Sequence, residues 1–262
     1  MTDLRPARRN GTRPPRESLA RAAERRADRR LRLTLLAVVG AVLLGLVLAV
    51  VVVGDDESGS TQTAKVRAGA VVPTGVSATT WAVTAYPGVT PKPGAPTLEV
   101  WEDFQCPACA ATEERTGDLI ESLARSGEIR LVWRPTTFLD ERLGNDASQR
   151  AVEAWGCAVD AGVGPEYHRT VFANQPQREG DGYTDEQLVS FGRTAGLSGS
   201  AQDTFEQCAT SGRYRQWAIN STAAFYDAGV PGTPAGYLDG EELPSGTLAD
   251  GKALLAAVRA AG

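Results

Sequence analysis

Residues 97–109 read TLEVWEDFQCPAC, and this stretch decides the fold. Residues 97–104 alternate in character and are rich in β-forming side chains, which predicts a strand. Residues 107–126 carry the periodic apolar positions of a helix, which Gly127 should end. Residues 129–134, IRLVWR, predict a second strand. A strand, a helix and a strand in such close succession form a βαβ unit, so we expect the two strands to be parallel.

A long helical segment is predicted after this unit, at about residues 144–229. Apolar side chains recur there at helical spacing. Thr184 and Gln187 match a capping box at the start of one of its helices, and Gly196 stands where that helix should end. The segment is therefore expected to be a helical insertion in an α/β fold.

Shorter elements flank these two parts of the chain. Two short strands are predicted ahead of the βαβ unit, at residues 71–76 and 81–85. After the insertion we predict a strand, a hairpin turn, a returning strand and a helix, at residues 235–238, 239–240, 241–243 and 247–261. With 42% hydrophobic and 23% charged residues, the chain can form a packed core, which excludes global disorder.

Chemistry is indicated by Cys106-Pro107-Ala108-Cys109 at the junction of the strand and the helix. The first turn of a helix leaves N–H groups unpaired and stabilises a thiolate, which lowers the pKa of Cys106. Pro107 suits the first helical position, and Cys109 lies on the same helix face as Cys106. We expect Cys106 to be the exposed attacking thiol and Cys109 the buried resolving thiol. Half of a zinc site and a purely structural bridge are the alternatives.

The chain contains one histidine, His168, and four cysteines. A single histidine excludes a site built on several histidines, and no metal or cofactor is expected. His168 lies in a predicted helix far along the chain from the Cys-X-X-Cys pair, so we expect it at the surface or at the edge of the core.

The N-terminal part is divided by charge. Residues 1–32 contain eleven Arg against four acidic residues, and residues 33–53 contain none of either. Those 21 residues would span roughly 31 Å as a helix, close to the thickness of a bilayer core. We therefore predict a basic cytoplasmic tail, a transmembrane helix, and a flexible stalk at residues 54–70, with residues 71–262 extracytoplasmic. A signal peptide and a core helix are the alternatives for the span; nucleic-acid binding is the weaker alternative for the tail, beside contact with anionic lipids.

The sequence resembles a known family at two places. WEDFQCPAC at residues 101–109 and GVPGTPAGYLDG at residues 229–240 are similar to the DsbA-like thioredoxin-fold disulfide oxidoreductases, most of all to the membrane-anchored actinobacterial members. The resemblance covers roughly residues 70–262. It implies a thioredoxin fold with a large helical insertion and a cis Pro234, preceded by Thr233, facing the active cysteines. The bond between Val230 and Pro231 is the second candidate for a cis peptide.

The resemblance also assigns the other two cysteines. Cys157 and Cys208 match the second, structural cysteine pair of the actinobacterial proteins, and a second redox relay is the alternative. Many relatives have a buried acid six residues before the first active cysteine, but that position is Val100 here. Glu102 and Asp103 are close by without matching it, so no residue is assigned to proton transfer.

The function that the resemblance implies is that of an extracytoplasmic oxidase, which introduces disulfides into reduced exported proteins. A quinone-linked membrane partner of the DsbB or VKOR type would reoxidise it, and we expect a monomer. The dipeptide Pro107-Ala108 lacks the His of the strongest oxidases, so a weaker oxidant is expected. The alternatives are a reductase or isomerase of the same compartment and a redox-inactive chaperone or binding module.

Overall fold

The computed structural model describes residues 68–262. The predicted basic tail, the predicted transmembrane helix and most of the predicted stalk lie outside these residues. Among the helices of residues 68–262, none combines the length and the apolar character needed to cross a bilayer.

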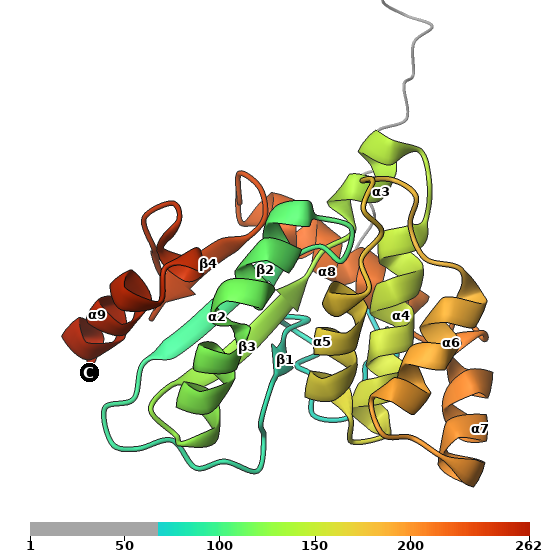
Figure 1. Cartoon of the computed structure of the whole chain (residues 1–262), viewed down its shortest axis with the longest axis horizontal. Coiled ribbons are helices and arrows are strands. Elements are labelled where there is room, and N and C mark those ends of the chain that lie inside the picture. Colours follow the sequence, from blue (N-terminus) through green and yellow to red (C-terminus); the bar gives the residue numbers. More distant parts are fainter. Residues whose placement is uncertain (1–67) are drawn as a thin grey trace, which may run out of the picture. The chain divides into compact units, whose positions relative to one another are not determined.

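A mixed sheet forms the centre of the described part (Figure 1). Its strands are β1 (Val83–Thr84), β2 (Thr97–Glu102), β3 (Arg130–Pro135), β4 (Ala235–Leu238) and β5 (Glu241–Glu242). Their order in the sheet is β1-β3-β2-β4-β5. As predicted, β2 and β3 are parallel, whereas β4 joins β2 in the antiparallel sense. The carboxyl end of β2 thus leads from the middle of the sheet directly into the cysteine motif.

Helices pack against the sheet, and several of them form a bundle to one side of it. Their bounds are α2 (Pro107–Arg125), α3 (Phe138–Leu143), α4 (Ala147–Asp160), α5 (Gly164–Ala173), α6 (Asp185–Thr194), α7 (Gly199–Ala209), α8 (Arg215–Asp227) and α9 (Gly251–Ala261). Helix α2 crosses in front of the sheet, and α4 to α7 form a bundle beside it (Figure 1). This bundle belongs to the predicted insertion between the βαβ unit and β4.

The sequence signals predicted for the start and end of one helix in the insertion are confirmed. Thr184 and Gln187 form the complete capping box at the start of α6, with each side chain bonded to the other residue's backbone N–H. Gly196 follows α6 with φ of +108°, a conformation that favours glycine. The end of α6 therefore follows from its sequence.

Three predicted elements differ from the structure. Residues 71–76 form no strand, because Pro73 lacks an N–H for a ladder and Gly75 turns the chain with φ of +77°. The strand predicted at residues 81–85 shortens to β1, because Trp81 has a positive φ of 61°. The closing helix is divided into a 3-10 turn, Thr247–Ala249, and α9, since the carboxylate of Asp250 accepts bonds from the first N–H groups of α9.

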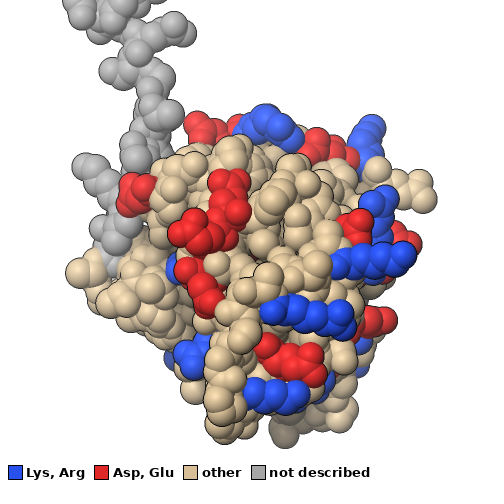
Figure 2. Space-filling view, turned by 90° about the vertical axis from the view of Figure 1, so that its left-hand side faces the viewer, with Lys and Arg blue, Asp and Glu red and all other residues tan. Residues whose placement is uncertain are grey.

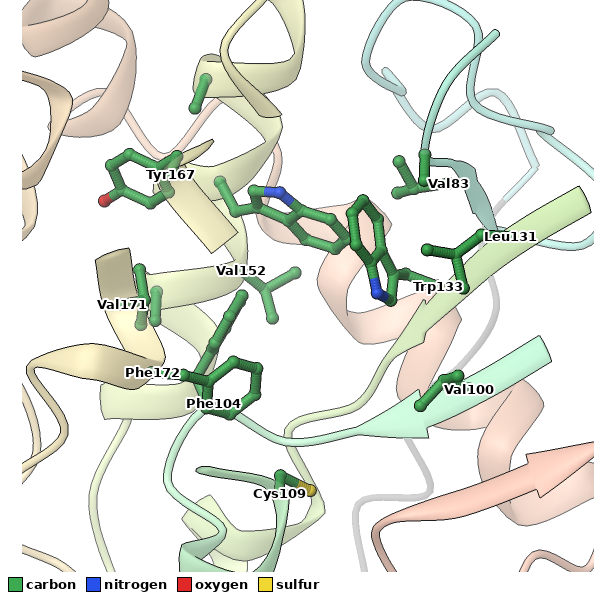
Figure 3. Close-up of a cluster of buried hydrophobic side chains, with 14 of the residues drawn as sticks. Val83, Val100, Phe104, Cys109, Leu131, Trp133, Val152, Tyr167, Val171 and Phe172 are labelled. Carbon is green, nitrogen blue, oxygen red and sulfur yellow. The ribbon is translucent and has the colours of Figure 1, made fainter. Parts of the chain in front are cut away.

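One apolar core joins the sheet to the insertion. Trp155 of α4 and Trp217 of α8 have no exposed surface. Their indole N–H groups donate to Gly164 O and Trp81 O, both at 2.9 Å. Figure 3 shows Cys109 at the margin of this core, with Phe104, Val100 and Trp133 above it. The Cys-X-X-Cys motif therefore lies where the helical insertion meets the central sheet.

The charge of the described part is strongly acidic. Residues 68–262 contain 25 Asp and Glu against 14 Lys and Arg, a net charge of −11. The face in Figure 2 carries a band of acidic side chains with basic ones interspersed toward the other side. This composition contrasts with the basic residues 1–32.

Candidate active site

Cys106 and Cys109 occupy the start of α2. Cys106 is the residue before the first helical position, Pro107 is the first, and the N–H of Cys109 donates to Cys106 O at 3.1 Å. Both thiols are free. The Cys106 thiol donates to Thr233 O at 3.3 Å, which brings together segments 127 residues apart.

We predicted that Cys106 would be exposed, but it is buried. Its residue surface is 6% accessible, against 3% for Cys109. The segment that carries Thr233 lies against Cys106, because the Cys106 thiol donates a hydrogen bond to Thr233 O. Pro234 and Cys109 line one small cavity. The sequence did not reveal that this segment buries Cys106, because the two segments are distant along the chain.

The two thiols have opposite electrostatic environments. Hydrogen bonding to the Cys109 thiol and to the N–H groups of Ala108 and Cys109 outweighs burial and lowers the pKa of Cys106 to about 6. Burial raises the pKa of Cys109 well above its usual value, and the neighbouring Cys106 and Glu102 raise it further. Cys106 is therefore a thiolate near neutral pH, whereas Cys109 holds its proton.

The peptide bond between Thr233 and Pro234 is cis, and no other residue pair in residues 68–262 has a cis bond. Pro234, rather than Pro231, is thus the proline in the conformation that the resemblance implies. The bond precedes β4, whose strand begins at Ala235 beside Trp101 of β2.

Cys157 and Cys208 form a disulfide between α4 and α7, with an S–S length of 2.03 Å and Cα atoms 5.8 Å apart. Cys157 is buried in the apolar core. The disulfide therefore ties two helices of the insertion together, at a site separate from α2.

We predicted His168 at the surface or at the edge of the core, but it is fully buried. It is 1% accessible, and its Nε2 forms a close contact with Glu102 Oε1. Its ring stacks on Trp133, with centroids 4.4 Å apart. Helix periodicity could have placed His168 on the inner face of α5, beside Val171 and Phe172, but nothing local pointed to Glu102.

A second polar network reaches the cysteine loop from the insertion. Asp103 has no exposed surface and accepts hydrogen bonds from Gln105 N, Leu139 N and the Ser148 hydroxyl. Burial raises the pKa of Asp103 to about 7, although these hydrogen bonds oppose the shift. Its own carbonyl accepts from Cys106 N at 2.9 Å. Asp103 thus couples the cysteine loop to α3 and α4.

Comparisons with known proteins agree with this geometry. A family model described as thioredoxin matches residues 91–257. The MdbA thiol-disulfide oxidoreductase of Actinomyces oris is similar in structure, with a TM-score of 0.60, 21% identity, and 72% of this chain and 89% of that chain covered. For the oxidised form of Mtb DsbA the TM-score is 0.55, the identity 24%, and the coverage 68% and 90%.

A third solved structure is the reduced disulfide bond oxidoreductase DsbG of Mycobacterium tuberculosis. It has a TM-score of 0.56 and 25% identity, and 69% of this chain and 86% of that chain are covered. No curated protein matches the sequence. The match over residues 91–257, together with the cysteine motif and the cis proline, shows that the chain belongs to the thioredoxin family and has the fold of its DsbA-like thiol-disulfide oxidoreductases.

Proposed function

We propose that the protein is an extracytoplasmic thiol-disulfide oxidase, which introduces disulfides into exported proteins through Cys106 and Cys109. The observation that carries the proposal is the lowered pKa of Cys106, about 6. At pH 7 a thiol of this pKa is about 90% thiolate. Stabilising this thiolate favours the reduced pair over its disulfide, so the disulfide is a good acceptor of electrons from clients.

The reaction has two exchange steps. A client thiolate attacks Cys106 Sγ, the bond to Cys109 breaks, and a mixed disulfide forms. A second client thiolate then attacks the client sulfur, and Cys106 leaves as a stable thiolate. The backbone of Thr233 lies beside Cys106 and would pair with an extended client segment.

The proposed setting of the enzyme rests on its sequence. Residues 33–53 would anchor it, with residues 1–32 in the cytoplasm and the cysteines outside. Reduced exported proteins would be its clients. A quinone-linked membrane enzyme of the DsbB or VKOR type would reoxidise Cys106 and Cys109, and this partner is proposed by analogy alone.

The reduction potential of the Cys106–Cys109 pair tests the direction of electron flow. The full-length chain would be equilibrated with glutathione buffers, and the oxidised fraction measured by thiol alkylation. A potential at or above about −180 mV supports an oxidase, and a value near −270 mV would favour a reductase. The variant Cys106→Ser distinguishes an oxidase or a reductase from a redox-inactive chaperone. It should abolish thiol-disulfide exchange, whereas a chaperone would keep its holding activity in that variant.

A further inference from the structure

The loop between α5 and α6 reaches the cysteine motif through the side chain of Gln175. This residue follows the C-cap of α5, and its backbone N–H donates to Phe172 O at 3.2 Å. Pro176 comes next and disfavours a helical backbone at Gln175, so α5 cannot continue. Because both neighbours restrict Gln175, less conformational entropy is lost when its half-buried side chain is held in one place.

The Gln175 amide holds two carbonyl groups in the turn between β2 and α2. Its Nε2 donates to Phe104 O at 2.8 Å and to Cys106 O at 3.1 Å. Both partners are acceptors, so the amide nitrogen, rather than the amide oxygen, faces the turn. The insertion is thus bonded directly to the backbone of a motif cysteine.

The bond to Phe104 O has a structural purpose. Strand β2 ends at Glu102, so Phe104 lies beyond its ladder, and Phe104 is only 2% accessible. A buried carbonyl without a donor is costly. The Tyr183 hydroxyl also donates to Phe104 O, at 2.8 Å. This carbonyl therefore keeps a donor when Gln175 is replaced, and we expect such variants to fold.

The bond to Cys106 O is not needed to satisfy that carbonyl. Cys106 O already accepts from Cys109 N at 3.1 Å and from Ala110 N at 3.2 Å. It belongs to the same residue as the attacking sulfur, so the negative end of this peptide dipole lies close to Cys106 Sγ. An amide N–H directed at Cys106 O offsets that negative charge, and this favours an anion on the sulfur.

We propose that Gln175 is a positioning residue for the exchange reaction, whose amide orients the Cys106 peptide and favours the Cys106 thiolate over the thiol. Gln175 acts through Cys106 O. The N–H groups of α2 are local donors to the sulfur, and Gln175 adds a donor from a different element. The inference rests on the proposed thiol-disulfide exchange and deepens it, since it gives the helical insertion a part in setting the reactivity of Cys106.

Two measurements on the full-length chain test this role: thiolate absorbance of the reduced protein against pH, and equilibrium of the pair with glutathione. Gln175→Leu keeps a similar volume and removes the amide. We expect the thiolate midpoint to rise by about 0.5 pH unit, roughly a threefold change in proton affinity. The equilibrium constant for reduction of the pair by glutathione should fall about threefold, because a less stable thiolate makes the disulfide a weaker oxidant.

A second variant keeps the shape of the side chain and changes its charge. In Gln175→Glu the donor becomes a carboxylate, which only accepts and whose charge opposes the thiolate. Both shifts should go in the same direction and be larger, about tenfold. The matched controls are Gln177→Leu and Gln177→Glu, because Gln177 is an exposed residue of the same loop. Neither control should shift the midpoint or the equilibrium constant as far as the same change at Gln175.

The outcomes separate the two proposals. If the wild-type pair does not exchange with glutathione, the proposed function fails. If it exchanges and Gln175→Leu has the same midpoint and equilibrium constant as Gln177→Leu, only the role of Gln175 is overturned. A lower melting temperature with an unchanged midpoint would also overturn it, because Gln175 would then only stabilise the fold. Should Gln175→Leu not fold, Gln175→Glu decides, and shifts equal to those of Gln177→Glu would overturn the inference.

Discussion

At the scale of single residues, two thiols three positions apart differ in their affinity for a proton. Cys106 lies at the N-terminus of α2, where unpaired N–H groups and the helix dipole stabilise its anion. Cys109 instead faces the apolar core and Glu102. One helical turn is enough to separate these environments, because the first N–H groups of a helix are unpaired only at its end. This difference supports the proposed attacking role of Cys106 and the proposed resolving role of Cys109.

Titration of the reduced protein checks the difference directly. The ultraviolet absorbance of thiolate should rise with pH with a midpoint of about pH 6, because hydrogen bonds to the Cys106 sulfur favour its anion. Cys106→Ser should remove this transition and Cys109→Ser should shift it upward, since the Cys109 thiol is the largest stabilising contact. A wild-type midpoint near 8.5, the value of an unperturbed cysteine, would contradict the assignment.

Asp103 makes stability depend on pH. Its folded pKa of about 7 is above the ordinary value of about 3.9, so its stabilising effect is complete below pH 4 and is lost as the pH rises through 7. Relative to Asp103→Asn, the wild type should lose up to about 1.4 kcal/mol of unfolding free energy per pH unit in this window. Urea denaturation from pH 4 to pH 8 measures the difference.

The control for this measurement is Asp118→Asn, which changes an exposed carboxylate on α2. Its difference from the wild type should vary little with pH. A constant difference for Asp103→Asn as well would show that the Asp103 carboxyl ionises in the folded protein as it does in the unfolded chain.

At the scale of elements, the disulfide between α4 and α7 and the capping box of α6 stabilise the insertion by different means. The capping box satisfies N–H groups within one helix, an effect of about 1 kcal/mol. The disulfide restricts the unfolded chain between two helices that are 51 residues apart in sequence. Disulfides persist in oxidising compartments, so this bond is consistent with the extracytoplasmic location proposed above.

Removing this disulfide distinguishes its structural role from a redox relay. Cys157→Ala with Cys208→Ala should lower the free energy of unfolding by about 4 kcal/mol, as the chain-entropy model gives for a loop of this length. The rate of exchange at Cys106 should stay unchanged at temperatures where the variant is folded. Loss of exchange in a folded variant would support the relay instead.

At the scale of the whole molecule, charge divides the chain. Residues 1–32 carry a net charge of +7, and residues 68–262 carry −11. The uncharged residues 33–53 lie between them in sequence. In the proposed topology these two parts would lie on opposite sides of a membrane, because positive charge is retained on the cytoplasmic side.

Cell fractionation tests this topology. The full-length chain should sediment with membranes and resist alkaline carbonate, and deletion of residues 33–53 should release it. Alkaline phosphatase fused after Gly262 should be active, because that enzyme needs an extracytoplasmic location to form its disulfides. An inactive fusion together with a soluble full-length chain would refute the anchor and its orientation.

Much of the fold could be predicted because its signals are local. Alternation at residues 97–104, helical periodicity after Pro107 and the turn at Asp239-Gly240 each depend on neighbours in sequence. The cysteine motif was recognisable for the same reason. Local signals failed where proline and glycine interrupt an apolar run, as in residues 71–76, and where Asp250 starts a new helix.

The sequence by itself determined the βαβ unit, the helical insertion and the place of Cys106 at a helix end, since these depend on dihedral preferences and periodic burial. Only the tertiary structure decided which charges meet inside. Glu102 and His168 are 66 positions apart, and Cys106 and Thr233 are 127 apart. Such contacts depend on how the sheet, α2 and the insertion pack together. Burial then sets the proton affinity of each group, because the desolvation of a charge depends on everything that surrounds it.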